Sequence, residues 1–232
     1  GAERIPVAEG VSLGACFHLA GTQAPNLLYF HGNGEIAVDY DDIGQAYSRA
    51  GISFLAVDYR GYGRSDGNPT ATNLLADCRR VFTWVCGWLQ KNGRKGPLAV
   101  MGRSLGSAAA LELARAFPGA IDALIIESGF AHTGPLLGTL GARNAALKLS
   151  AGDGFGQLAK IKNYPGPTLI IHAERDHLIP LGEGQALFEA SPAPEKEMLT
   201  IPGANHNDIF MRAWPTYLAA VAKLLFACQA KT

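Results

Sequence analysis

The chain has 232 residues, of which 48% are hydrophobic and 17% are charged, and its 20 basic and 20 acidic side chains give a formal net charge of zero. That composition supplies a large apolar core and excludes an intrinsically disordered chain. A neutral chain with both signs of charge spread along it also argues against a nucleic-acid-binding protein, which usually carries a basic face. The length fits a single α/β domain over residues 1–232.

Short apolar segments recur along the chain and predict strands. Leu13–Leu19 alternates apolar and polar residues, which is typical of a strand at the edge of a sheet. The later segments are almost continuously apolar, as in parallel strands that are buried on both faces. These later segments are Asn26–Phe30, Phe54–Tyr59, Leu98–Met101, Ala123–Ile126, Thr168–His172 and Met198–Ile201.

Helical patterns fall between these segments. Asn73–Gln90 repeats apolar residues three and four apart, which gives one apolar face. Ser104–Phe117, Gly182–Ala190 and Asp208–Cys228 are the other predicted helices. Strands that alternate with helices predict an α/β fold with a doubly wound, mostly parallel sheet. Residues 129–167 are rich in glycine and proline, and we expect a short lid-like insert there.

The four cysteines form no CxxC pair and have no histidine cluster near them, which argues against a bound metal. Cys78 and Cys86 lie in an apolar helical pattern, and we expect both thiols to be buried. Unpaired cysteines favour a reducing compartment, so the expected location is the cytoplasm. Because no run of about eighteen apolar residues occurs, we expect no membrane span, and no signal-peptide pattern opens the chain.

The segment Gly102-Arg103-Ser104-Leu105-Gly106 joins a predicted strand to a predicted helix and matches the pattern G-x-S-x-G. In this pattern the chain turns sharply, so that the serine hydroxyl stands above the edge of the sheet. The glycines are required because the turn leaves no room for Cβ atoms. We interpret Ser104 as a nucleophile, and the alternative is a serine that only caps the following helix.

A serine nucleophile needs a base, and the base needs an acid that orients it. Asp176 follows one late predicted strand and His206 follows the next, each in a loop before a helix. We therefore expect Asp176 to be the acid and His206 to be the base. Glu174 and Glu127 are alternative acids, whereas Asp208 is expected to cap the last helix.

An oxyanion formed by attack of the serine needs hydrogen-bond donors. The N–H of Leu105, which follows the nucleophile, is one candidate. The other is the N–H of Asn33, in the glycine-containing loop His31–Glu35 that follows an apolar strand. Glycines there allow the backbone to approach a reacting carbonyl closely. The alternative is a simple glycine turn.

Five motifs taken together resemble the α/β-hydrolase superfamily of serine hydrolases, and they occur in the order of that family. They are HGNGE at 31–35, DYRGYGRSDG at 58–67, GRSLG at 102–106, HAERDHLIP at 172–180 and GANHND at 203–208. The resemblance implies the α/β-hydrolase fold, a Ser-His-Asp triad and no cofactor. The HGN form differs from the HGGG form of one lipase and esterase branch, so lipase specificity is not carried over.

The resemblance also suggests roles for residues around the triad. Tyr62 is expected to face the substrate pocket, and Glu35 is a further candidate for substrate contact. Arg103 is expected to be structural or to lie at the surface, with substrate contact as the alternative. The residues expected to be structural are Asp58, Arg60 and Ser65.

The predicted activity is hydrolysis of an ester or thioester of a small acyl compound through an acyl-enzyme intermediate. The alternatives are a peptidase or amidase of the same fold and a non-catalytic protein that uses the fold as a binding scaffold. The insert at 129–167 is too short for a large cap domain. We therefore expect a shallow site that prefers acyl groups of about two to six carbons, where a matching apolar pocket ends.

Overall fold

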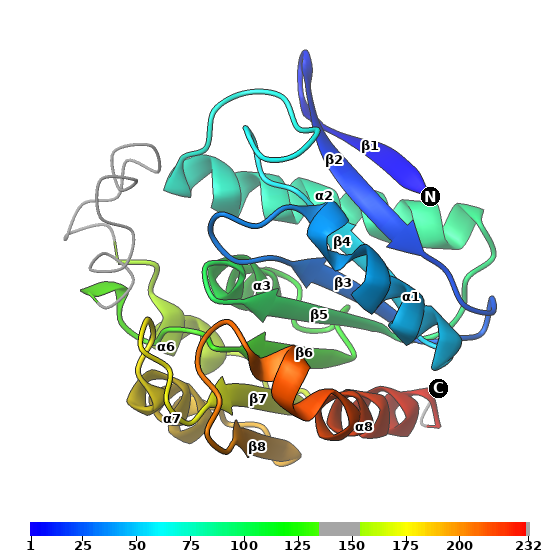
Figure 1. The fold of residues 1–232 in the computed structure, drawn as a ribbon. Coiled ribbons are helices and arrows are strands. Elements are labelled where there is room, and N and C mark those ends of the chain that lie inside the picture. The colour runs from blue at the N-terminus through cyan, green and yellow to red at the C-terminus, as the bar shows by residue number, and fades with distance from the viewer. Residues whose placement is uncertain (135–153, 231–232) are drawn as a thin grey trace.

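A computed structural model describes residues 1–134 and 154–230, and within them eight strands form one sheet. The strands are β1 (Ala2–Ala8), β2 (Val11–His18), β3 (Asn26–Phe30), β4 (Ser53–Val57), β5 (Leu98–Arg103), β6 (Ala123–Glu127), β7 (Thr168–Ala173) and β8 (Lys196–Ile201). Their order in the sheet is β1-β2-β4-β3-β5-β6-β7-β8 (Figure 1). The pairs β1–β2 and β2–β4 are antiparallel and all later pairs are parallel.

Helices cover both faces of the sheet. The helical elements are η1 (Ala37–Tyr40), α1 (Asp41–Arg49), α2 (Ala71–Lys91), α3 (Gly106–Ala116), α6 (Gln157–Ile161), α7 (Leu181–Ala190) and α8 (Ile209–Gln229). Helices α1 and α8 lie on one face, and α2, α3, α6 and α7 lie on the other (Figure 1). This arrangement confirms the predicted doubly wound, mostly parallel α/β sheet.

The core has two halves because neighbouring residues of a strand point to opposite faces. In β3, Leu28 and Phe30 pack under α2 and α3, whereas Leu27 and Tyr29 pack under α1 and α8. Every residue of β3, β4, β5, β6 and β7 is buried. Coverage on both faces explains why these strands are continuously apolar in the sequence.

The N-terminal edge of the sheet differs from the prediction. The expectation that Leu13–Leu19 forms an edge strand is wrong, because β2 lies between β1 and β4. The edge strand is β1, which buries Ile5 and Val7 and contains Pro6 at a register shift in its pairing with β2. Proline is tolerated at an edge because its missing N–H faces no partner strand, but it weakens the strand signal in the sequence.

Helix α8 is long and apolar enough to cross a membrane, judged by length and composition alone. In the sequence this helix does not form an uninterrupted apolar run, because it contains Arg212 and Lys223. Tyr217, Val221 and Leu225 form a buried stripe of α8 against the sheet, while 22% of its most apolar window is buried. The helix therefore packs on the core through one side.

The expected insert at 129–167 is described only at its two ends. Residues 135–153 lie outside the described residues, so the lid-like insert stays a prediction. At the C-terminal end, α6 buries Gln157, Lys160 and Ile161 and packs against α3. The ion pair between Lys160 and Glu112 of α3, 3.0 Å long, joins the end of the insert to the core.

The turn from β5 to α3 is so tight that glycine is required on both sides of it. A Cβ atom on Gly102 would lie 2.2 Å from the carbonyl oxygen of Gly106. A Cβ atom on Gly106 would lie 2.1 Å from the carbonyl oxygen of Phe30, at the end of β3. Both distances are far shorter than a van der Waals contact, and the contacted atoms belong to the backbone, which cannot move aside as a flexible side chain can.

We expect Gly106→Ala to lower the free energy of unfolding by about 1–3 kcal/mol, because the added methyl group overpacks the contact between α3 and β3. The matched control is Gly87→Ala in α2, where no atom lies within 4 Å of the added carbon. That change should leave stability equal or raise it by up to about 1 kcal/mol, since alanine favours a helix over glycine. Urea unfolding followed by circular dichroism measures both. Equal stability of the two variants would contradict the tight turn.

Candidate active site

Ser104 lies in the turn between β5 and α3 and has a left-handed backbone, with φ at 50°. A non-glycine residue in this region is strained, and other contacts must hold it there. Its N–H donates to the carbonyl oxygen of Glu127 at 2.8 Å, and its carbonyl oxygen accepts from the N–H and Oγ of Ser107 at 3.0 and 2.7 Å. These bonds fix the serine at the N-terminus of α3, where the helix dipole favours negative charge.

Asp176 and His206 contact each other in the loops that follow β7 and β8. The Nδ1 atom of His206 lies 2.8 Å from Oδ2 of Asp176, and both residues are buried. Oδ1 of Asp176 accepts the N–H groups of Leu178 at 3.0 Å and Ile179 at 2.8 Å. Burial acts to raise the pKa of Asp176, but the bond and charge of His206 and the two N–H groups lower that pKa below its ordinary value. The carboxylate is thus held in its charged form.

The two alternative acids have other partners. Glu174 is exposed, and its carboxylate accepts the N–H of Gly203 at 2.7 Å. Glu127 is fully buried and accepts from Arg103 at 2.9 Å and from the hydroxyl of Tyr217 at 2.7 Å. Burial raises the pKa of Glu127, although the charge of Arg103 acts in the opposite direction. Of the three acids considered, Asp176 is the one that contacts the His206 ring.

A second buried histidine, His172, lies next to Asp176. The Nε2 atom of His172 lies 2.9 Å from the carbonyl oxygen of Ile179 and 3.7 Å from Oδ2 of Asp176. Burial lowers the pKa of His172, which favours the neutral ring. Gly184 of α7 lies against this ring, because a Cβ atom there would be 2.4 Å from Nδ1. His172 therefore belongs to the packing of the acid loop.

The guanidinium of Arg103 is buried and has three partners. Its Nε donates to Glu35 at 3.0 Å, and its Nη1 donates to Glu127 at 2.9 Å. Its Nη2 donates to the carbonyl oxygen of His206 at 2.9 Å. Arg103 was expected to be structural or to lie at the surface, with substrate contact as the alternative. Its burial contradicts the surface position, and these bonds favour the structural role. They also tie the loop of His206 to the residue next to Ser104.

The loop with the candidate oxyanion donor is held by side chains on both sides of Asn33. Oε2 of Glu35 accepts the N–H of Gly32 and the hydroxyl of Tyr40, each at 2.6 Å. The Tyr62 hydroxyl donates to Oδ1 of Asn33 at 2.7 Å. Burial opposes the charge on Glu35, but Arg103 and these hydrogen bonds lower its pKa. The contacts of Glu35 favour loop positioning over the expected contact with substrate.

The loop after β4 supports the same region. Oδ1 of Asp58 accepts the N–H of Ala37 at 2.7 Å and lies 3.3 Å from Nε2 of His31. The Tyr59 hydroxyl donates to the carbonyl oxygen of His31 at 2.6 Å. The other residues expected to be structural are also bonded within the fold, Arg60 to Asp77 at 2.6 Å and Ser65 to the N–H of Gly14 at 2.9 Å.

Asp208 occupies the N-cap position of α8, as expected, but its side chain makes no capping bond to the helix. Its carboxylate instead accepts the N–H of Asn205 at 2.7 Å and the amide group of the same side chain at 2.9 Å. Arg212 bonds to it one turn along the helix, at 2.5 Å. Asp208 therefore closes the loop that carries His206.

All these loops lie at one edge of the sheet, because the parallel strands end there together. The carboxyl ends of β3, β5, β6, β7 and β8 carry the loop of Asn33, Ser104, Glu127, Asp176 and His206, in that order. Ligand sites of open α/β sheets occur at this edge. Tyr40 and Tyr217 were not predicted as part of this region, since a buried tyrosine in a helical segment gives no signal in the sequence that its hydroxyl reaches a carboxylate.

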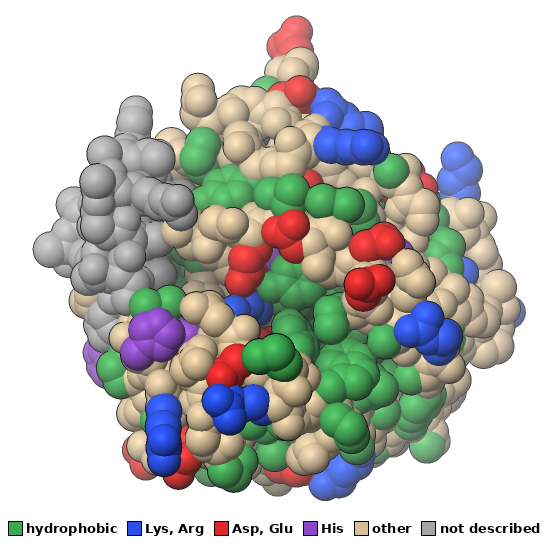
Figure 2. All heavy atoms as spheres, in the orientation of Figure 1, with side chains coloured by type: hydrophobic (Ala, Val, Ile, Leu, Met, Phe, Trp, Pro, Cys, Tyr) green, Lys and Arg blue, Asp and Glu red, His purple; other side chains and the backbone are tan. Residues whose placement is uncertain are grey.

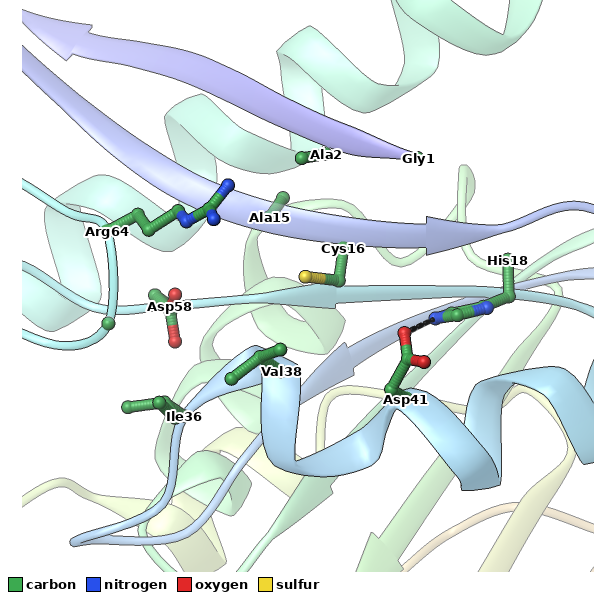
Figure 3. A pocket seen from close by; sticks show the side chains of 11 residues that line it. Gly1, Ala2, Ala15, Cys16, His18, Ile36, Val38, Asp41, Asp58 and Arg64 are labelled. Carbon is green, nitrogen blue, oxygen red and sulfur yellow. Dashed lines mark ion pairs between the residues drawn. The ribbon is translucent and has the colours of Figure 1, made fainter.

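Two further features of the described residues are an apolar surface patch and a cavity. Figure 2 shows hydrophobic side chains gathered on the face that carries α1 and α8. The exposed large hydrophobic residues include Met211 of α8, at 85%, and Val38 of η1, at 56%. A cavity of about 480 Å³ lies between β2, η1 and the loop of Arg64 (Figure 3). Cys16 and Asp58 line it, and none of Ser104, Asp176 and His206 does. This cavity is separate from the candidate site.

The cysteines and acids of the described residues show no group of three or more that could hold a metal ion. No disulfide joins the four cysteines, all of which lie in the described part of the chain. Cys78 is buried as expected, and burial raises the pKa of its thiol. The expectation that Cys86 is also buried is wrong, because its side chain is only half-buried where it packs against the margin of the core.

Comparison with known proteins relates the sequence to hydrolases. The family described as Serine aminopeptidase, S33, matches residues 22–152. Alpha/beta hydrolase domain-containing protein 17B from Homo sapiens is 35% identical over 190 residues, 79% of this chain and 60% of that protein. An uncharacterized protein of Mycobacterium tuberculosis is 30% identical over 222 residues, 94% of this chain and 76% of the relative. The chain thus spans less than two thirds of the human relative.

Solved structures share the fold. Est1E from Butyrivibrio proteoclasticus, with ferulic acid bound, has a TM-score of 0.78 and 20% identity, and the match covers 99% of this chain and 100% of that chain. A soluble variant of monoglyceride lipase from Saccharomyces cerevisiae, with a substrate analog, has a TM-score of 0.75 and 19% identity, covering 98% and 94%. At these identities the likeness establishes the fold alone.

The lowered pKa of Asp176 predicts a pH-dependent contribution to stability. A lowered folded-state pKa stabilises the protein above the unfolded value of about 3.9, and the contribution is lost as the pH falls through the folded value. Asp176→Asn should therefore lower the free energy of unfolding by about 1–2 kcal/mol near neutral pH. The difference in the free energy of unfolding between this variant and the wild type should shrink as the pH is lowered.

Glu174→Gln, at the exposed neighbouring acid, is the control and should stay within about 0.5 kcal/mol of the wild type. Urea unfolding of the three proteins across the acidic range measures the difference. A gap for Asp176→Asn that stays constant on acidification would contradict the assignment of the charged form.

Proposed function

The chain belongs to the α/β-hydrolase superfamily, in its serine aminopeptidase family, and from this we propose that it is a serine hydrolase with Ser104 as the nucleophile. The observation that carries the proposal is the 2.8 Å contact between His206 Nδ1 and the buried carboxylate of Asp176. A histidine oriented by an acid is the group that activates a serine hydroxyl for attack, and the strained turn that carries Ser104 supports the same assignment.

In the proposed mechanism, Ser104 Oγ attacks the acyl carbonyl and His206 takes its proton. The bond to Asp176 places the proton of the neutral ring on Nδ1, so Nε2 is the nitrogen that accepts from the serine. The negative carboxylate then stabilises the imidazolium. His206 returns the proton to the leaving group, and the ester formed on Ser104 is hydrolysed by a water that His206 deprotonates in turn.

The oxyanion of each tetrahedral intermediate is assigned to the N–H groups of Leu105 and Asn33. Leu105 stands at the first turn of α3, where helix N–H groups lack partners within the helix. The side chain of Asn33 is fixed by Tyr62, which supports a fixed direction for the loop backbone. Preorganised donors of this kind stabilise developing charge without the cost of reorienting water.

An ester or thioester of a small acyl group is the proposed substrate. The name of the yeast structure, a monoglyceride lipase, supports ester chemistry on this fold. The description of the matching family as a serine aminopeptidase favours one alternative, hydrolysis of an amide. Parallel assays with p-nitrophenyl esters, acyl-CoA thioesters and peptide p-nitroanilides separate these classes.

Ser104→Ala should lower kcat for p-nitrophenyl acetate by at least about 1,000-fold, because the nucleophile is removed. His206→Ala should lose nearly as much, and the double variant should lose little more, since the two side chains act as one unit. Circular dichroism checks that the variants are folded. Substantial turnover by Ser104→Ala, or no turnover by the wild type on any of the three substrate classes, would contradict the proposed function.

Activity should peak with acyl groups of about two to six carbons, because each methylene adds about 0.8 kcal/mol of binding only while it finds apolar contact. The proposal rests on the shortness of the insert at 129–167. Measurement of kcat/KM over a series of p-nitrophenyl esters decides it. A value that still rises at about twelve carbons would reject the short-chain substrate and favour a lipid-like one.

A further inference from the structure

The guanidinium of Arg103 connects three parts of the proposed active site that are distant in sequence. Arg103 directly precedes Ser104, and the register of β5 and β6 places it opposite Glu127. Its other partners are Glu35, which follows the loop of Asn33, and the backbone carbonyl of His206. One side chain thus contacts the nucleophile turn, the oxyanion loop and the base loop.

The three bonds need the shape of an arginine. A planar guanidinium carries five N–H donors in fixed directions, and here Nε, Nη1 and Nη2 each serve a different partner. A lysine ammonium has the same charge, but it is a single point on a flexible stem. It can pair with a carboxylate but cannot reach three separated acceptors in one plane.

The carboxylates of Glu35 and Glu127, which bond to the guanidinium, each accept a further hydrogen bond from a tyrosine. Tyr40 donates to Glu35 at 2.6 Å, and Tyr217 of α8 donates to Glu127 at 2.7 Å. Glu127 is fully buried, and the side chain of Arg103 is 6% exposed. Since a buried and hydrogen-bonded ion network leaves little freedom, the third bond of Arg103 has a defined direction, toward the His206 carbonyl.

We propose that Arg103 is a positioning residue that acts through His206, holding the base loop against the serine turn so that the imidazole meets Ser104. The inference rests on the proposed serine hydrolase function. The Nδ1 bond to Asp176 fixes the orientation of the ring, whereas the Arg103 bond fixes the backbone from which the ring extends. A displacement of about 1 Å at such a base lowers the rate about 100-fold.

The test uses Arg103→Lys, which keeps the charge between the two buried carboxylates and removes the bond to His206. The matched control is Arg79→Lys, because Arg79 bonds to the buried carboxylate of Glu112 at 2.7 Å and joins α2 to α3 away from the site. For each protein, kcat and KM with p-nitrophenyl acetate and the rate constant of fluorophosphonate labelling are measured. The assay temperature is one at which circular dichroism shows every variant folded.

Arg103→Lys should lower kcat and the labelling rate about 10- to 100-fold and leave KM within about twofold, while Arg79→Lys stays within about twofold of the wild type in all three. The same substitution is then made in the His206→Ala background, on its residual hydrolysis. If Arg103 acts through His206, Arg103→Lys changes that residual rate by less than about twofold, because the interaction has already been removed.

Two results would overturn the inference. One is wild-type kcat and labelling in Arg103→Lys, and the other is an equal loss in the wild-type and His206→Ala backgrounds, which would show a general effect on the fold. If Arg103→Lys does not fold, Glu35→Gln is measured instead, in the same wild-type and His206→Ala backgrounds. It weakens one of the two carboxylate contacts that orient the guanidinium. A wild-type protein that is not labelled would instead reject the proposed function itself.

Discussion

The close approach of α3 to the end of β3 is the constraint on which the rest of the site depends. Gly106 sits so near the carbonyl of Phe30 that no side chain fits between helix and strand. At this separation the chain passes from β5 into α3 through a left-handed residue, and that residue is Ser104. The same contact fixes the end of β3 beside the turn. The start of the Asn33 loop and the turn of the candidate nucleophile are therefore held in fixed relative positions.

A buried network of charged side chains, formed by Arg103, Glu35 and Glu127, positions the loops around this turn. Taking a guanidinium and two carboxylates out of water is costly, and the cost is offset only when each group is bonded in good geometry. Here Arg103 bonds to both carboxylates, and Tyr40 and Tyr217 satisfy their remaining oxygens. The network lies on the α1 and α8 face of the sheet and joins the ends of β5 and β6 to the loops of Glu35 and His206, so it specifies how these loops sit relative to one another more than it adds stability.

Much of the fold and the candidate triad could be predicted from the sequence, because the buried strands are continuously apolar and the motifs stand at their ends. The edge strand β1 could not, since Pro6 weakens its pattern, and α1 could not, since it buries only Gly44 and Tyr47. Asp176 and Glu174 are equivalent by spacing, and only the path of the loop decides which one meets His206. The partners of Arg103 could not be predicted either, because they come from segments far apart in the sequence.

The central claim is that the strained serine of the β5–α3 turn is the nucleophile. Mass spectrometry of the protein after reaction with a fluorophosphonate, followed by peptide mapping, tests this claim most directly. The account predicts one covalent adduct per chain, located on Ser104, and no adduct on the neighbouring Ser107. An unmodified protein, or an adduct on another residue while Ser104 stays free, would contradict it.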